Sequence, residues 1–238
     1  MLSIKNFSKT YKNGGKRAVD GLTLTVSAGD IFGFIGHNGA GKTTTLRACA
    51  GILPFEEGEI TLNGVSVRDN PVACKRKIAY IPDNPDLYDY LTGRQYLDFV
   101  ADIFEVPASV RVNRVNEYAS LFEISGNLSE LISSYSHGMK QKLAVVSALI
   151  HEPTLFILDE PFVGLDPVAS LALKNIMHDM CKNGSAFFFS THILEVAEKL
   201  CNKIAIIKDG RLAACGDTTD IIGNSSLEHA FMGLIDHE

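Results

Sequence analysis

The stretch Gly36-His37-Asn38-Gly39-Ala40-Gly41-Lys42-Thr43-Thr44 fits the phosphate-loop pattern G-x-x-x-x-G-K-[ST]. An apolar run, residues 31–35, precedes it and has the length of a buried strand. Residues 44–50 follow it and are typical of the first turns of a helix. Strand, loop and helix in this order are the context that the pattern requires. The alternative is a glycine-rich turn that matches by coincidence, which this context makes rare.

Nucleotide binding follows from the physical chemistry of such a loop. Its glycines let the backbone curl so that several N–H groups converge on one anion. A helix that begins at Lys42 adds its free N–H groups and the positive end of its dipole. We expect Lys42 to reach the β- and γ-phosphates, and the Thr43 hydroxyl to ligate Mg²⁺.

Composition narrows the class of protein. The 238 residues are 46% apolar, enough for a substantial core, and 22 Lys and Arg face 28 Asp and Glu, for a net charge of −6. Since there is no basic run, we expect no nucleic-acid partner. The five cysteines include no C-x-x-C pair, which favours free thiols in a reducing compartment. Neither a signal core nor a run of 18 uncharged apolar residues is present, so we expect a cytoplasmic chain without a membrane span.

The order of apolar patterns predicts an α/β fold. Alternating residues predict an antiparallel front end, with an edge strand at 2–11, a turn at 13–15 and a half-solvated strand at 22–26. Residues 56–59 are interpreted as a turn before a short strand at 60–62. From residue 154 onward, strands and helices alternate, which predicts a mainly parallel sheet. The strands are expected at 78–81, 155–158, 186–190 and 204–208, and the helices at 168–182 and 193–200.

Between these parts, apolar residues recur at helical spacing over 91–104 and 110–122. We therefore expect one domain over residues 1–238. Its α/β core comprises roughly residues 1–83 and 151–238, and a helical subdomain is inserted at roughly 84–150.

Two further motifs stand at predicted strand ends, where parallel sheets place their ligands. Asp159 and Glu160 follow the strand at 155–158, so Asp159 can join a Mg²⁺ shell and Glu160 can polarise the attacking water. His192 follows the strand at 186–190 and can bind a γ-phosphate or hold that water. The alternatives are solvated surface acids, and a histidine that caps a helix or lies in the core.

Ser136-His137-Gly138 precedes a long helical pattern and has two interpretations. A helix start rich in Ser and Gly can bind a second anion. The simpler interpretation is an ordinary N-cap with Ser136 as the capping side chain, and the residues alone favour it.

Together these residues resemble the ATP-binding subunit of ABC transporters, over essentially the whole chain. Tyr135-Ser136-His137-Gly138-Met139 resembles the L-S-G-G-Q signature, Gly164-Leu165-Asp166-Pro167 the D-loop, and Ser190-Thr191-His192 the H-loop. Tyr11 resembles the aromatic residue that stacks on adenine. The form of the signature and the segment 87–93 resemble the ATPases of ABC-2-type exporters in particular.

The resemblance implies a P-loop NTPase that hydrolyses ATP with Mg²⁺ in a two-fold dimer, either with itself or with a homologous subunit. Each ATP would lie between residues 36–44 of one subunit and the signature of the other, which comprises Ser136, His137, Gly138 and Met139. Lys42, Glu160 and His192 would be catalytic, and Asp166 would belong to the D-loop. Thr43 and Asp159 would bind the metal, and Asp83 stands where the family has its Q-loop glutamine, so its metal role is the most open.

An integral membrane permease is the partner that the resemblance implies, and the chain would be peripheral on the cytoplasmic face through it. The coupling surface would lie near residues 83–92. Leu87, Tyr88, Tyr90 and Leu91 could grip a permease helix there, or pack inside the helical lobe. A soluble ABC ATPase of an assembly or regulatory complex is the alternative function, and a ribosome- or nucleic-acid-associated one is disfavoured by the acidic charge.

Overall fold

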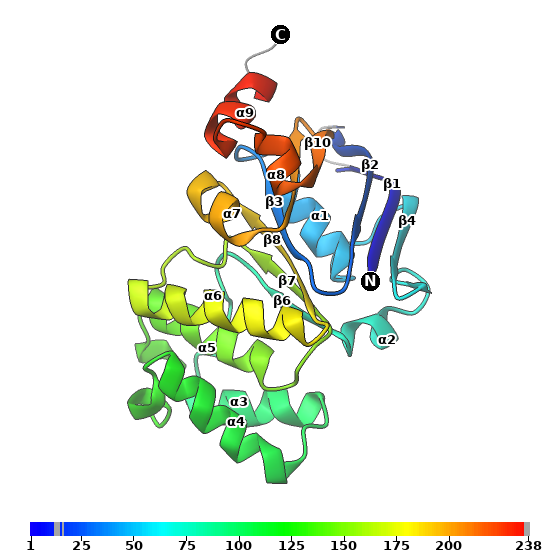
Figure 1. Ribbon diagram of the computed structural model, residues 1–238. Coiled ribbons are helices and arrows are strands. Elements are labelled where there is room, and N and C mark those ends of the chain that lie inside the picture. The colour runs from blue at the N-terminus through cyan, green and yellow to red at the C-terminus, as the bar shows by residue number, and fades with distance from the viewer. Residues whose placement is uncertain (12–14, 16, 236–238) are drawn as a thin grey trace.

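The computed structural model describes residues 1–11, 15 and 17–235 (Figure 1). Its strands form two sheets. In the antiparallel sheet the order is β2 (Arg17–Val26), β1 (Leu2–Thr10), β4 (Glu57–Leu62) and β5 (Val65–Ser66). Asn13 and Gly14 of the predicted turn lie outside the described residues.

The larger sheet carries the site. Its order is β10-β9-β3-β8-β7-β6, and all neighbours pair in parallel except β10 with β9. The sequence prediction of a mainly parallel sheet joined to an antiparallel part is therefore confirmed. The six strands are β3 (Ile31–Ile35), β6 (Ile78–Ile81), β7 (Leu155–Asp159), β8 (Ala186–Thr191), β9 (Lys203–Lys208) and β10 (Arg211–Asp217).

Helix α1 (Lys42–Cys49) and the antiparallel sheet cover one face of this sheet and a layer of helices covers the other, which explains why its strands are continuous apolar runs. Phe32, Phe34 and Phe188 point into one core together with residues of α1. The alternate residues Phe187 and Phe189 point into the other core, on the side of α5 (His137–Leu149), α6 (Pro167–Lys182) and α7 (Leu194–Leu200).

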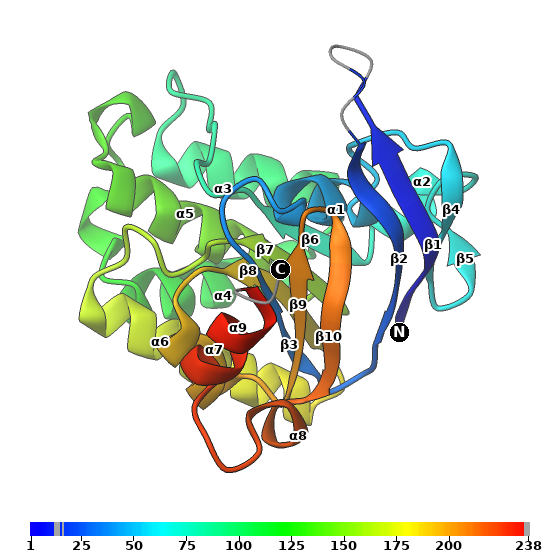
Figure 2. The same cartoon turned by 90° about the horizontal axis from the view of Figure 1, so that it is seen from above.

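The remaining helices contribute no residue to the phosphate loop. The helical periodicity at 91–104 and 110–122 corresponds to α3 (Gly93–Ile103) and α4 (Ala108–Leu121), which lie with α5 at one end of the molecule (Figure 1). The view from above shows α8 (Thr218–Ile222) and α9 (Leu227–Ile235) near α7, and α2 (Pro71–Lys75) beside the antiparallel sheet (Figure 2). Short 3₁₀ turns cover Ser125–Asn127 and Ile132–Ser134. The division into a core and a helical subdomain stays a prediction.

Two local predictions in the antiparallel sheet are wrong. β1 is an interior strand, because Leu2 pairs with Val26 on one side and with Leu62 on the other. Residues 57–59 belong to β4 and are not a turn. Gly58 adopts φ +84° where β4 pairs with β1. A Cβ atom there would lie 2.5 Å from the Asn6 carbonyl oxygen. This glycine therefore marks a close approach of two backbones rather than a reversal of the chain.

His151, just after α5, has a half-buried ring with a lowered pKa. Its imidazole stacks on Phe104 with 3.7 Å between the ring centroids. Within the described part of the chain its Nδ1 is buried without a hydrogen-bond partner. Burial lowers the pKa of His151 from 6.5 to about 4, so the folded protein holds the neutral ring.

We expect His151 to destabilise the fold as the pH falls from 6.5 towards 4, because in this window the unfolded chain binds a proton that the folded chain does not. At pH 5 this amounts to about 2 kcal/mol. The variant His151→Phe keeps a stacked ring and should lose the same amount of pH dependence. Urea titrations of both proteins at pH 7 and pH 5 measure the free energies of unfolding, and an equal pH dependence in the two would contradict the prediction.

Candidate functional site

A cavity of about 200 Å³ lies at the carboxyl ends of β3 and β7. The predicted loop, the strand-end acids and Asp83 meet there, although they are far apart in the sequence. A larger groove of about 630 Å³, between α4 and α6, is lined by none of the predicted site residues. The lining of the smaller cavity consists of Ala18, Asn38, Gly39, Gly41, Lys42, Thr43, Thr44, Asp83, Asp159 and Glu160.

The backbone of the loop is fixed by two glycines that no larger residue could replace without movement. A Cβ at Gly36 would lie 2.5 Å from the Ile207 carbonyl oxygen, and one at Gly41 would lie 2.5 Å from that of Ala18. Gly41 also has φ +110°, which disfavours any L side chain. It is the N-cap of α1 and has no side chain with which to cap it, so the first N–H groups of the helix are available to an anion.

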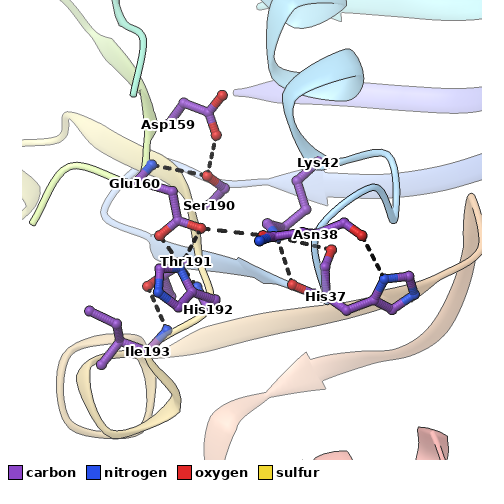
Figure 3. Close-up of polar contacts among 10 residues, drawn as sticks. His37, Asn38, Lys42, Asp159, Glu160, Ser190, Thr191, His192 and Ile193 are labelled. Carbon is purple, nitrogen blue, oxygen red and sulfur yellow. Dashed lines mark hydrogen bonds and ion pairs between the residues drawn. The ribbon is translucent and has the colours of Figure 1, made fainter. Parts of the chain in front are cut away.

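Lys42 holds its ammonium group inside the loop. Nζ donates to the Gly36 carbonyl oxygen at 2.6 Å and to that of His37 at 3.2 Å (Figure 3). Burial lowers the pKa of Lys42, and the nearby carboxylates of Glu160 and Asp159 oppose this shift. The loop thus positions a buried cation where a phosphate would enter.

Glu160 lies between Lys42 and His192. Its Oε1 is 4.0 Å from Lys42 Nζ and 3.0 Å from His192 Nδ1. The side chain of Glu160 is 12% exposed and that of His192 is 55% exposed. The predicted alternatives for His192 do not describe its position, because the ring is not in the core and Ile193 is the N-cap of α7. The pair can polarise a water molecule at the mouth of the cavity.

Asp159 is buried, and one of its oxygens accepts a hydrogen bond from the Ser190 hydroxyl at 2.5 Å. The donors near it fit Mg²⁺, which prefers carboxylate, hydroxyl and water oxygens. Thr43, Asp159 and Asp83 all line the cavity. Among the described residues, no cluster of three or more His, Cys, Asp or Glu could hold a metal. A bound Mg²⁺ would therefore complete its shell with nucleotide phosphates and water.

Tyr11 reaches the loop from the end of the first strand. Its hydroxyl is 3.2 Å from Thr44 Oγ1, and its ring is 41% exposed. His37 turns away from the cavity, with Nδ1 2.8 Å from the Asn38 carbonyl oxygen and Nε2 3.7 Å from Asp209. Ala40 is buried and accepts a hydrogen bond from Gly210 N–H at 3.0 Å. Tyr11 is thus placed where an adenine ring could stack, and His37 and Ala40 join the loop to the β9–β10 turn.

The signature residues do not line the cavity of their own chain. Ser136 is the N-cap of α5, and its Oγ accepts the Met139 N–H at 3.3 Å, as the simpler interpretation predicts. Gly138 lies so close to Gly164 that a Cβ would meet the carbonyl oxygen of Gly164 at 2.7 Å, and the His137 ring packs against the same glycine.

The D-loop is tied to this helix start. Lys142 Nζ lies 2.5 Å from Asp166 Oδ2, and Asp166 Oδ1 caps α6 by accepting the Ala169 N–H at 2.8 Å. Hydrogen bonds from Ala169 and Lys142 lower the pKa of Asp166. The signature and the D-loop therefore form one surface patch.

The four residues proposed for the coupling surface, in the segment after β6, differ in their exposure. Leu87 is 9% exposed, and Leu91 packs against the core around α3 and α5, so both serve the interior. Tyr90 is 74% exposed and Tyr88 is 45% exposed, with 5.9 Å between their ring centroids. The two tyrosines are therefore free to meet a partner.

Sequence reasoning missed one residue of the site. The H-loop resemblance includes Ser190 but assigns it no role, yet its hydroxyl contacts both Asp159 and the backbone of Glu160. The available signal is the pair of hydroxyl residues, Ser190 and Thr191, that ends an otherwise apolar strand.

The chain is similar in sequence and in fold to ATP-binding proteins of ABC transporters. A family model described as ABC transporter matches residues 19–163. The chain is 37% identical over 228 residues to an uncharacterized ABC transporter ATP-binding protein of Nostoc sp., covering 93% of this chain and 68% of that protein. It is 36% identical over 210 residues to the bacitracin transport ATP-binding protein BcrA of Bacillus licheniformis, covering 88% and 68%. A solved structure described as the ATP binding subunit of an ABC transporter is 34% identical, with a TM-score of 0.94 over 98% of this chain and 99% of that one.

Proposed function

The chain belongs to the ABC transporter ATP-binding family and is an ATPase, and we propose that it couples ATP-driven closure of a dimer to a separate membrane permease, in the direction of export. One observation supports the closure: residues 136–139, the proposed second half of an ATP site, do not line the phosphate-loop cavity of their own chain. A second subunit can supply the missing half.

In this proposal the single chain binds the ATP phosphates through residues 36–44, and Tyr11 stacks on the base. Thr43 and Asp159 would hold Mg²⁺, with Asp83 close enough to contact a metal-bound water. Glu160 would polarise the attacking water, with His192 beside it and Lys42 on the phosphates. Ser136 and Gly138 of the other subunit would close over the γ-phosphate, with Asp166 at the subunit boundary. Closure by ATP and opening after hydrolysis form an order-and-closure switch.

A groove beside the exposed tyrosines is proposed as the permease contact. It has a volume of about 290 Å³ and lies between β6 and the helices α3 and α5. Tyr88 packs edge-on against Phe99, with 5.5 Å between the ring centroids, which extends the aromatic surface next to the groove. A permease helix could insert an apolar side chain there. Pro82, Pro85, Leu87, Tyr96, Val100 and Phe104 are among the groove's lining residues.

Support for export comes from the resemblance of the signature and of residues 87–93 to ABC-2-type exporter ATPases, and from the name of the related bacitracin transport protein. In the described residues no helix has the length and apolarity needed to cross a bilayer. From the family resemblance we propose that the chain acts on the cytoplasmic face of a membrane through its permease. The division into a core (1–83 and 151–238) and a helical subdomain (84–150) is part of this proposal.

A pull-down from detergent-solubilised native membranes tests the transport function. We expect the tagged chain to recover an integral membrane protein in stoichiometric amount, and Tyr90→Arg to reduce that recovery by about tenfold, because a charge would be buried in an apolar contact. Thermal unfolding of the variant checks that it is folded. Recovery of soluble partners alone would favour the alternative function, an ABC ATPase of an assembly or regulatory complex without transport.

A further inference from the structure

Ser190 is a buried hydroxyl in an apolar strand. It follows Phe187, Phe188 and Phe189 in β8 and has no exposed surface. In the parallel register of β7 and β8 it stands beside Asp159. A buried hydroxyl destabilises a fold unless it is hydrogen-bonded, so its partners explain what it does here.

Both hydrogen bonds of the Ser190 hydroxyl join it to the acidic residues at the end of β7. Its Oγ donates to Asp159 Oδ1 at 2.5 Å and accepts the Glu160 N–H at 3.0 Å (Figure 3). Because a hydroxyl carries a single proton, which goes to the carboxylate, the backbone N–H must be the donor in the second bond. Asp159 Oδ1 is thus fixed, and Oδ2 remains for the cavity.

Glu160 needs such support. It has φ +50°, in the left-handed region that a residue with a side chain enters only when its surroundings hold it there. The hydrogen bond from its N–H to Ser190 fixes the peptide that leads into this conformation. That conformation carries the carboxylate to Lys42 and His192, so one hydroxyl sets the relative positions of both acids.

We propose that Ser190 is a positioning residue for ATP hydrolysis: its hydroxyl fixes Asp159 for the metal and holds Glu160 in the conformation that places its carboxylate at the mouth of the cavity. The inference rests on the proposed roles of Asp159 and Glu160. Ser190 itself is fully buried beside the two acids and does not line the cavity. Without its hydroxyl the Asp159 side chain is free to rotate and the Glu160 N–H is buried without a partner.

Ser190→Ala tests the inference with two readouts, the binding of a fluorescent ATP analogue with Mg²⁺ or with EDTA, and the kcat and KM for ATP. We expect unchanged affinity in EDTA, an about tenfold smaller gain in affinity from Mg²⁺, and a kcat lower by about ten- to a hundredfold, as for a lost hydrogen bond to a charged group. Ser190→Thr keeps the hydroxyl and should restore most of both quantities.

Thr218→Val is the matched control, because it removes another buried hydroxyl whose hydrogen bond to the Cys201 carbonyl oxygen is 2.7 Å long. We expect it to leave the Mg²⁺ gain and kcat unchanged. If Ser190→Ala does not fold, Ser190→Cys replaces it, with a weaker donor of similar size and an intermediate effect expected.

The inference is overturned if Ser190→Ala keeps the Mg²⁺ gain and kcat of the parent, and Asp159→Asn then shows which proposed role fails. If Ser190→Ala lowers only the unfolding temperature while the Mg²⁺ gain and kcat stay as in the parent, the hydroxyl merely stabilises the fold. If Asp159→Asn also leaves the Mg²⁺ gain intact, the metal role proposed for Asp159 fails together with the role of Ser190. Loss of the gain in Asp159→Asn but not in Ser190→Ala would refute the role of Ser190 alone.

Discussion

Glu160→Gln is expected to bind MgATP, to hydrolyse it at least about a hundredfold more slowly, and to accumulate as a dimer. The amide has the shape of the carboxylate but cannot take a proton from water. The substitution also removes the negative charge 4.0 Å from Lys42 Nζ. The Lys42 ammonium group then interacts with the ATP phosphates alone, so binding is preserved. Since closure needs bound ATP and opening needs hydrolysis, the closed state should persist.

Size-exclusion chromatography at micromolar protein measures this directly. The variant should elute as a dimer in MgATP and as a monomer when EDTA is added. Glu195→Gln is the control, because Glu195 is an exposed residue of α7 that pairs with Lys199 at 2.7 Å, and the same loss of charge there should change neither turnover nor association. A Glu160→Gln protein that stays monomeric in MgATP would argue against ATP-driven closure.

The phosphate loop and the strand-end acids could be predicted from the sequence because each is a local pattern with a local cause. Glycine spacing allows the loop to curl, and an apolar run that ends in Asp159 and Glu160 predicts a buried strand with polar groups at its end. Parallel strands then bring these ends to one edge of the sheet, so the topology alone places the acids near Lys42.

The pairing of strands in the sheets and the side-chain hydrogen bonds could not be predicted in this way. Whether β1 is an edge strand depends on β4, whose residues pair with it from 49 to 60 positions away in the sequence. Residues 56–59 contain the glycine and the charged residues that are typical of a turn. A glycine is required at position 58, however, because the backbone of Asn6 lies so close to it. The role of Ser190 depends on partners 30 and 31 positions earlier. Periodicity carries no information on such pairs.

Ser136→Asp is expected to keep the fold and ATP binding of the single chain but to reduce turnover by at least about a hundredfold, because it places a negative charge against the γ-phosphate of the other subunit. Aspartate caps helices about as well as serine, so the N-cap of α5 survives. Turnover and equilibrium binding of a fluorescent ATP analogue measure the two effects separately.

The same substitution decides between the two interpretations of Ser136, because a capping role and a phosphate-binding role predict opposite results. In the Glu160→Gln background, Ser136→Asp should abolish the MgATP-dependent dimer while thermal unfolding stays close to that of the parent. Ser136→Asn, a cap without the charge, is the matched control and should retain more of the dimer. Full turnover in Ser136→Asp would mean that Ser136 only caps its helix, and that the missing half of the ATP site lies elsewhere.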